Sequence, residues 1–62
     1  MKFKVGDRII YRAGDSGYFA KEGKRGTVIE AEDLSTYPYL ITFDFSSKAW
    51  PVKEDELEAI DA

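Results

Sequence analysis

Three adjacent carboxylates, Glu54-Asp55-Glu56, come closest in this sequence to a set of residues able to perform general acid–base chemistry. Nucleophilic catalysis normally places a Ser, Thr or Cys beside a base that titrates near neutral pH. The chain has 62 residues with no His and no Cys, so that base would have to be a tuned carboxylate or lysine. Adjacent acids in a one-turn segment usually point into water. We therefore expect no catalytic residues and no enzymatic activity.

The glycines and acidic residues give no pattern for a cofactor or a metal. The spacing of Gly14, Gly17, Gly23 and Gly26 does not match a Walker or dinucleotide-binding loop. The segment Asp15-Ser16-Gly17 lacks the spaced acidic ligands of a calcium loop. The sequence therefore predicts no cofactor and no metal site.

Basic residues lie on both sides of an aromatic pair between positions 12 and 25, which is chemistry suited to nucleic acid. Cationic side chains there would contact phosphates, while Tyr18 and Phe19 would stack on bases. The cationic candidates are Arg12, Lys21, Lys24 and Arg25. Against this alternative stands the sequence pI of about 4.8, because nucleic-acid-binding domains are usually basic.

The net charge of −3 conceals an uneven distribution along the chain. Seven Lys and Arg against three acids give residues 1–29 a charge of +4, and two Lys against nine acids give residues 30–62 a charge of −7. Such a division is compatible with a charged binding face. It is also compatible with an acidic surface that inhibits a partner by imitating nucleic-acid phosphate.

Length and composition indicate one domain, covering residues 1–62. Such a short chain buries a small core, so aromatic residues must supply much of it. The sequence contains neither a long apolar run nor a signal-peptide pattern, and we expect no membrane association. The absence of Cys fits a reducing compartment, and we expect a cytoplasmic monomer or weak homodimer.

Strand signals position all of these residues, because short β-branched and aromatic runs recur with turn residues between them. The third run has the clearest alternation: Tyr37, Tyr39, Ile41, Phe43 and Phe45 share one face. The predicted strands are residues 8–12, 25–31, 37–45, 48–53 and 57–60, with a single 3-10 turn at 53–57 before the last strand. The predicted core is Val5, Ile9, Val28, Ile41, Phe43, Trp50, Val52, Leu57 and Ile60.

The order and spacing of these elements resemble the SH3-like barrel superfamily over residues 3–60. Val5-Gly6-Asp7 and Gly26-Thr27-Val28 are similar to the strand entries of KOW-type and Tudor-like bacterial modules. The tail from Ala49 to Ile60 is similar to the end of many such barrels. The chain also resembles small SH3-like proteins encoded by phages and prophages. The resemblance implies an all-β, five-stranded antiparallel barrel.

In SH3-like barrels the ligand face lies between the first loop, the second loop and the 3-10 turn. Carried onto this chain, the resemblance gives five partner-binding candidates: Tyr18, Phe19, Tyr37, Tyr39 and Trp50. Core packing is the competing interpretation for Phe19, Tyr39 and Trp50, so Tyr18 and Tyr37 are the expected exposed pair. The acidic 3-10 turn lacks the Tyr that peptide-binding SH3 domains carry there, which disfavours polyproline recognition. The leading prediction is a small non-catalytic module that docks on a larger protein, with a KOW-like nucleic-acid binder and an acidic inhibitor as alternatives.

Overall fold

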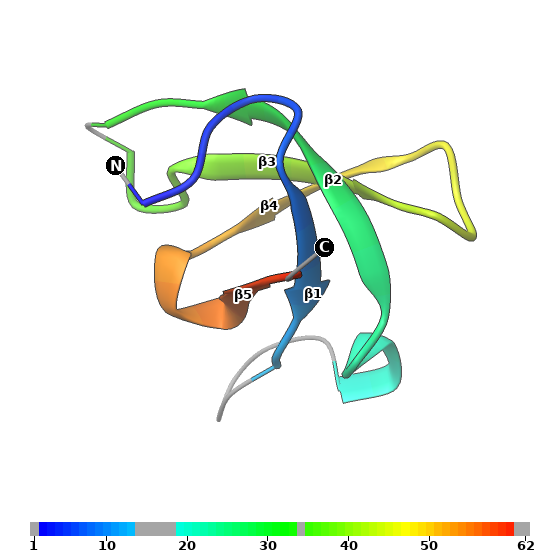
Figure 1. Ribbon diagram of the computed structural model, residues 1–62. Coiled ribbons are helices and arrows are strands. Elements are labelled where there is room, and N and C mark those ends of the chain that lie inside the picture. The colour runs from blue at the N-terminus through cyan, green and yellow to red at the C-terminus, as the bar shows by residue number, and fades with distance from the viewer. Residues whose placement is uncertain (1, 14–18, 34, 61–62) are drawn as a thin grey trace.

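The computed structural model describes residues 2–13, 19–33 and 35–60. It contains five strands and two 3-10 turns, with no α-helix in the described residues (Figure 1). The elements are β1 (Arg8–Tyr11), η1 (Phe19–Lys21), β2 (Arg25–Ala31), β3 (Tyr39–Phe43), β4 (Ala49–Val52), η2 (Glu54–Glu56) and β5 (Leu57–Ala59). The all-β prediction is confirmed. The predicted 3-10 turn before the last strand is confirmed as η2, and η1 is a further 3-10 turn that lies inside the first loop.

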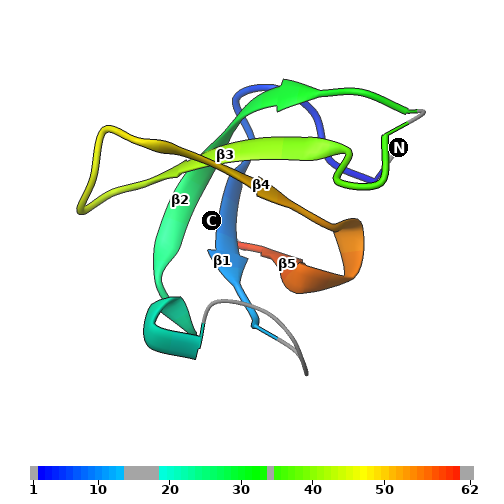
Figure 2. The same cartoon turned by 180° about the vertical axis from the view of Figure 1, so that it is seen from behind.

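All five strands belong to one antiparallel sheet in the order β4-β3-β2-β1-β5. Strand β2 is the longest and pairs with β1 through its first residues and with β3 along most of its length. Strands β4 and β5 end the series, and in the described residues no ladder joins them. Instead, η2 leads the chain from one to the other (Figures 1 and 2). The five antiparallel strands of the prediction are confirmed, but the ladders of the described residues do not close the sheet into the predicted barrel.

Strand β3 follows the predicted alternation of buried and partly exposed residues. Tyr39, Ile41 and Phe43 are each no more than 1% exposed, whereas Leu40 and Thr42 are half-buried. Tyr37 and Phe45 share the same parity but lie outside the strand, and both are exposed. The core face of β3 is therefore limited to its three central alternating residues.

Val5 was predicted in the core and is instead 62% exposed. It lies in a tight turn in which the Asp7 amide donates to the Lys4 carbonyl and Gly6 adopts a φ of +97°. Such a φ suits glycine, so Gly6 permits the turn that brings Val5 to its outer side. Phe3, two residues earlier, takes the buried position at 5% exposure.

The remaining core predictions are mostly confirmed. Ile9, Val28, Ile41, Phe43, Val52 and Leu57 are buried, while Trp50 and Ile60 are half-buried. The core also contains Phe3, Tyr11, Ala13 and Tyr39, which were not in the predicted set. Three edge-to-face ring contacts hold the aromatic part of the core together. The rings of Tyr11 and Trp50 both contact Phe43, and the ring of Phe3 contacts Tyr39.

A β-bulge at Ile29 changes which side chains of β2 reach solvent. Val28 pairs with Ile41, but the next pair is Glu30 with Leu40, so Ile29 is an additional residue in the ladder. Simple alternation from the buried Val28 would direct Glu30 into the core. The bulge shifts the register, and both Ile29 and Glu30 are exposed.

Candidate interaction surface

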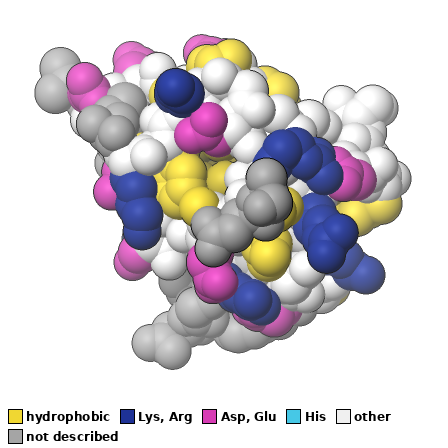
Figure 3. All heavy atoms as spheres, viewed as in Figure 1, with side chains coloured by type: hydrophobic (Ala, Val, Ile, Leu, Met, Phe, Trp, Pro, Cys, Tyr) yellow, Lys and Arg dark blue, Asp and Glu magenta, His cyan; other side chains and the backbone are white. Residues whose placement is uncertain are grey.

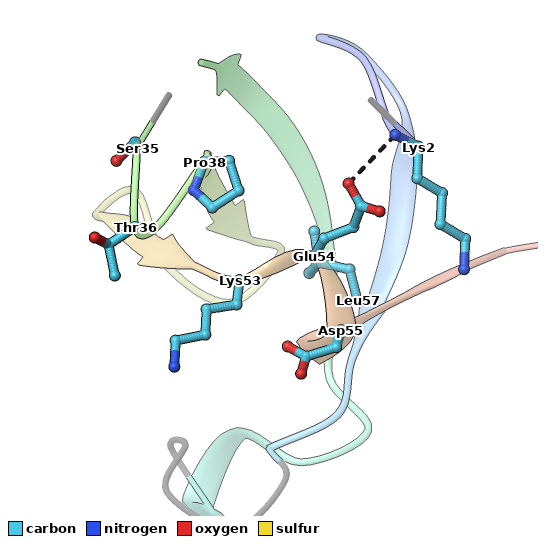
Figure 4. Close-up of a pocket in the computed structure, with 8 residues that line it drawn as sticks. All are labelled: Lys2, Ser35, Thr36, Pro38, Lys53, Glu54, Asp55 and Leu57. Atoms are coloured by element: carbon cyan, nitrogen blue, oxygen red, sulfur yellow. Dashed lines mark hydrogen bonds between the residues drawn. The ribbon is translucent and has the colours of Figure 1, made fainter. Parts of the chain in front are cut away.

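A pocket of about 530 Å³ lies between the β2–β3 loop and η2. The loop contributes Ser35, Thr36 and Pro38, and the segment around η2 contributes Lys53, Glu54, Asp55 and Leu57. Lys2 of the N-terminal segment completes the wall (Figure 4). The pocket has polar and apolar surface in similar amounts, and its lining residues carry both signs of charge. We call this the loop–η2 pocket.

Glu54 is held in the wall of this pocket by two hydrogen bonds. The hydroxyl of the fully buried Tyr39 donates to Glu54 Oε2 at 2.9 Å, and the backbone N–H of Lys2 donates to the same oxygen at 3.4 Å. Figure 4 shows the Glu54 side chain turned toward Lys2, whereas the Lys53 side chain extends away from it. These hydrogen bonds, the one from Tyr39 first, lower the pKa of Glu54 below its ordinary value. Burial, with the bond to Glu54, raises the pKa of Tyr39.

A second buried tyrosine holds the other end of η2. The Tyr11 hydroxyl donates to Glu56 Oε2 at 3.0 Å, and the backbone N–H of Arg12 donates to the Glu56 carbonyl at 2.7 Å. The other carboxylate oxygen of Glu56 accepts from the backbone N–H of Lys53 at 2.8 Å, which closes the turn on itself. The acidic turn is therefore fixed at both ends by the core and is not a loosely solvated loop.

A smaller pocket of about 140 Å³ lies on the outer face of the sheet, and we call it the outer-face pocket. Its walls are Glu30 of β2, Leu40 of β3, and Glu32, Tyr37 and Pro38 of the loop between them. Pro38 lines both pockets. The β2–β3 loop thus separates an acidic, partly apolar hollow from the loop–η2 pocket.

Tyr37 is the exposed aromatic residue of this region. Its side chain is 49% exposed, and the Lys53 ammonium lies 5.6 Å from its ring centroid. The ring therefore connects the two pockets, because it lines one of them while Lys53 lines the other. The predicted exposure of Tyr37 is confirmed.

Among the other partner-binding candidates, the structure describes the side chains of Tyr39 and Trp50 alone. Tyr18 lies outside the described residues. For Phe19 the structure describes the backbone in η1 but not the side chain. Tyr39 is fully buried and Trp50 is half-buried against the core, so core packing is the role that the structure gives to both.

Two of the four cationic candidates for nucleic-acid binding contact other side chains, and two form no ion pair with the described residues. Arg12 bridges Glu22 and Glu58, with N–O distances of 3.2 and 3.0 Å, and these partners raise the pKa of its guanidinium. Lys21 places its ammonium 4.4 Å from the centroid of the Trp50 ring. Lys24 and Arg25 are exposed and form no ion pair with the described residues.

Figure 3 shows Lys and Arg side chains near one another on the right half of this face, with Asp and Glu side chains beside them. Arg8 illustrates this pattern, because its guanidinium makes a bidentate pair with Asp44 at 2.7 and 2.6 Å. The pair lowers the pKa of Asp44 below its ordinary value. Residues from the positive and negative halves of the sequence thus neutralise one another in space.

Within the described ranges, His, Cys, Asp and Glu residues form no group of three that would hold a metal ion. That part of the chain also has no helix with the length and apolar character needed to cross a membrane. No family model matches the chain, and no curated protein and no solved structure matches it either. The surface itself is therefore the basis for inferring a function.

Proposed function

We propose that this protein is a small non-catalytic module that docks on a segment of a larger protein. The docking surface is the β2–β3 loop with the loop–η2 pocket on one side of it and Tyr37 at its border. The observation that carries the proposal is this combination of an open 530 Å³ pocket with a neighbouring ring that is half exposed. Aromatic residues at the edge of a pocket are typical anchors of protein interfaces.

The fixed position of η2 supports the same proposal. Two buried tyrosine hydroxyls and two backbone N–H groups hold Glu54 and Glu56, so the pocket wall is formed before a partner arrives. A preformed wall lowers the ordering cost of association. We further propose that the fold is SH3-like. The strand order β4-β3-β2-β1-β5 and the 3-10 turn between β4 and β5 support that assignment.

A protein partner is favoured over the two alternatives. Nucleic-acid binding would rest on Lys24 and Arg25, because Arg12 is already paired with two glutamates. An acidic inhibitor would need freely presented carboxylates. Many acids of the second half instead accept hydrogen bonds inside the molecule: Asp44 from Arg8, Glu54 from Tyr39, Glu56 from Tyr11 and Glu58 from Arg12.

Selection from a displayed peptide library on the immobilised protein tests the proposal. Selected peptides should bind the Tyr37→Ala variant about 30-fold more weakly, since interface aromatics commonly act as hot spots. Phe45→Ala is the matched control, because Phe45 is 57% exposed but lies at the β3–β4 turn. Peptides that bind Tyr37→Ala unchanged, or that lose affinity for both variants alike, would contradict the proposed surface.

A further inference from the structure

The outer-face pocket combines two carboxylates with apolar walls. Glu30 and Glu32 supply the carboxylates, while Tyr37, Pro38 and Leu40 supply apolar surface. Both glutamates are exposed, and the described residues include no cation paired with either of them. The pocket therefore presents uncompensated negative charge beside apolar groups, unlike the ion-paired surface around Arg8 and Arg12.

The backbone directs these groups to one place. The bulge at Ile29 shifts the register of β2, so Glu30 pairs with Leu40 and shares its outer face of the sheet. Bulges commonly re-aim a side chain close to a functional site. Ile29 itself is 42% exposed, which adds apolar surface to the same strand. An uninterrupted ladder would have directed Glu30 toward the core.

We propose that the outer-face pocket receives an Arg or Lys side chain of the protein partner. The aliphatic stem of such a side chain would pack on Leu40 and Pro38, and its charged head would meet Glu30 and Glu32. The Lys53 ammonium already lies 5.6 Å from the Tyr37 ring centroid, so the incoming charged head is assigned to the two glutamates and not to this ring. Charge complementarity thus selects a basic partner segment.

This inference rests on the proposed docking function and names one chemical feature of the partner. It concerns Glu30 and Glu32, which do not line the loop–η2 pocket. Docking at Tyr37 therefore remains testable by peptide selection whatever the outer-face pocket binds. Conversely, if the arginine experiment below fails, the proposed cation subsite is refuted, and the docking proposal still depends on the peptide selection alone.

The probe is N-acetyl-arginine amide, followed by the backbone ¹⁵N–¹H spectrum of the protein. N-acetyl-citrulline amide is the matched ligand, because it has nearly the same shape without the charge. The arginine compound should saturate the shifts of Glu30, Glu32, Tyr37 and Leu40 with a dissociation constant of about 1 mM. Binding should weaken as the salt concentration rises from about 0.02 to about 0.5 M.

Substitutions in the two pockets show which of them binds the arginine compound. Glu30→Gln with Glu32→Gln should weaken arginine binding at least about fivefold, because two exposed charge contacts are lost. Asp55→Asn, which removes a carboxylate of the loop–η2 pocket, should leave it unchanged. Equal shifts with citrulline, absence of saturation, or shifts centred on η2 that Asp55→Asn removes would each overturn the proposal. The same shifts appearing without ligand as the protein is concentrated would assign the face to a second copy, and would overturn it too.

Discussion

The hydroxyl of Tyr39, a fully buried residue, donates a 2.9 Å hydrogen bond to Oε2 of Glu54, an exposed residue of the pocket wall. The same hydroxyl oxygen accepts the backbone N–H of Phe3 at 3.1 Å. One atom in the core therefore fixes both the N-terminal segment and η2. The stability of the fold and the shape of the loop–η2 pocket are linked through this residue.

Replacing Tyr39 with Phe should reduce the free energy of unfolding by about 1–3 kcal/mol, because the buried Phe3 N–H and the Glu54 carboxylate both lose a partner. Urea denaturation followed by tryptophan fluorescence measures this change. The matched control is Tyr37→Phe, which removes an exposed hydroxyl and should change the free energy by less than about 0.5 kcal/mol. Equal effects of the two substitutions would show that the buried hydroxyl is not structurally important.

Acid should destabilise the fold partly through Glu54. Its pKa is lower in the folded protein than the ordinary value of 4.5, so the folded state favours the ionised form. The resulting stabilisation is present above that value and is lost as the pH falls through the lower, folded-state pKa. Melting temperatures measured by circular dichroism from neutral pH downward should therefore fall less steeply for Glu54→Gln than for the wild type. An identical acid profile for Glu54→Gln and the wild type would refute this account.

Phe43→Ala should reduce the free energy of unfolding by about 3–5 kcal/mol, because a ring that is 1% exposed leaves a cavity in the core. In so small a domain this loss should abolish cooperative unfolding near 37 °C. Phe45→Ala removes a ring that stacks on Phe43 at 5.2 Å but is itself exposed, and should cost about 0.5–1.5 kcal/mol. Differential scanning calorimetry of both variants shows which one loses more stability. A larger loss of stability for Phe45→Ala than for Phe43→Ala would contradict the core assignment.

Gly26→Ala should destabilise the fold by about 1–3 kcal/mol through crowding in the β2–β3 ladder. A methyl group at this position would lie 2.5 Å from the Thr42 carbonyl oxygen, which belongs to the backbone of β3 and has little freedom to move. Gly6→Ala provides the comparison, because open space surrounds Gly6 and only its φ of +97° opposes a side chain. Denaturant midpoints should show both losses. If the Gly26→Ala variant instead unfolds at the wild-type midpoint, the two strands do not approach each other as closely as the structure shows.

Labelled RNA and DNA oligomers should show no saturable change in fluorescence anisotropy with about 100 μM protein at about 20 mM salt. The reason is that, of the four cationic candidates, Arg12 is ion-paired and Lys21 lies against the Trp50 ring. The other two candidates, Lys24 and Arg25, offer few phosphate contacts. Saturable binding with a salt slope of about −2, abolished by charge reversal at these two residues, would instead support the KOW-like alternative.

The strands were predictable because their signal is local. Alternation identified the buried face of β3, and β2 was predicted with the bounds that the structure has. The parity that placed Ile9 in the core would also have identified Tyr11, which lies two residues later in the same strand. The core prediction for Val5 is wrong because its apolar character gives no sign of the turn that Gly6 permits, which leaves Val5 exposed.

The candidate surface was less predictable, because it depends on pairings between distant residues. Lys2 and Glu54 meet only after the chain has passed through all the strands except β5. The bulge at Ile29 has no clear local signal, since isoleucine is an ordinary strand residue. Only the exposure of Tyr37 followed from its position at the end of an alternating run, beside Pro38.

The position of Lys2 in the wall of the loop–η2 pocket has a practical consequence for handling the protein. A bulky group attached at Lys2 would lie in the wall of this pocket and compete with any docking segment. Near the other end, the Ile60 N–H donates to the Arg8 carbonyl, so Ile60 lies beside β1 and is not among the residues that line the pocket. A bulky group attached at Ile60 should keep the proposed surface open, whereas the same group at Lys2 offers a simple way to block it.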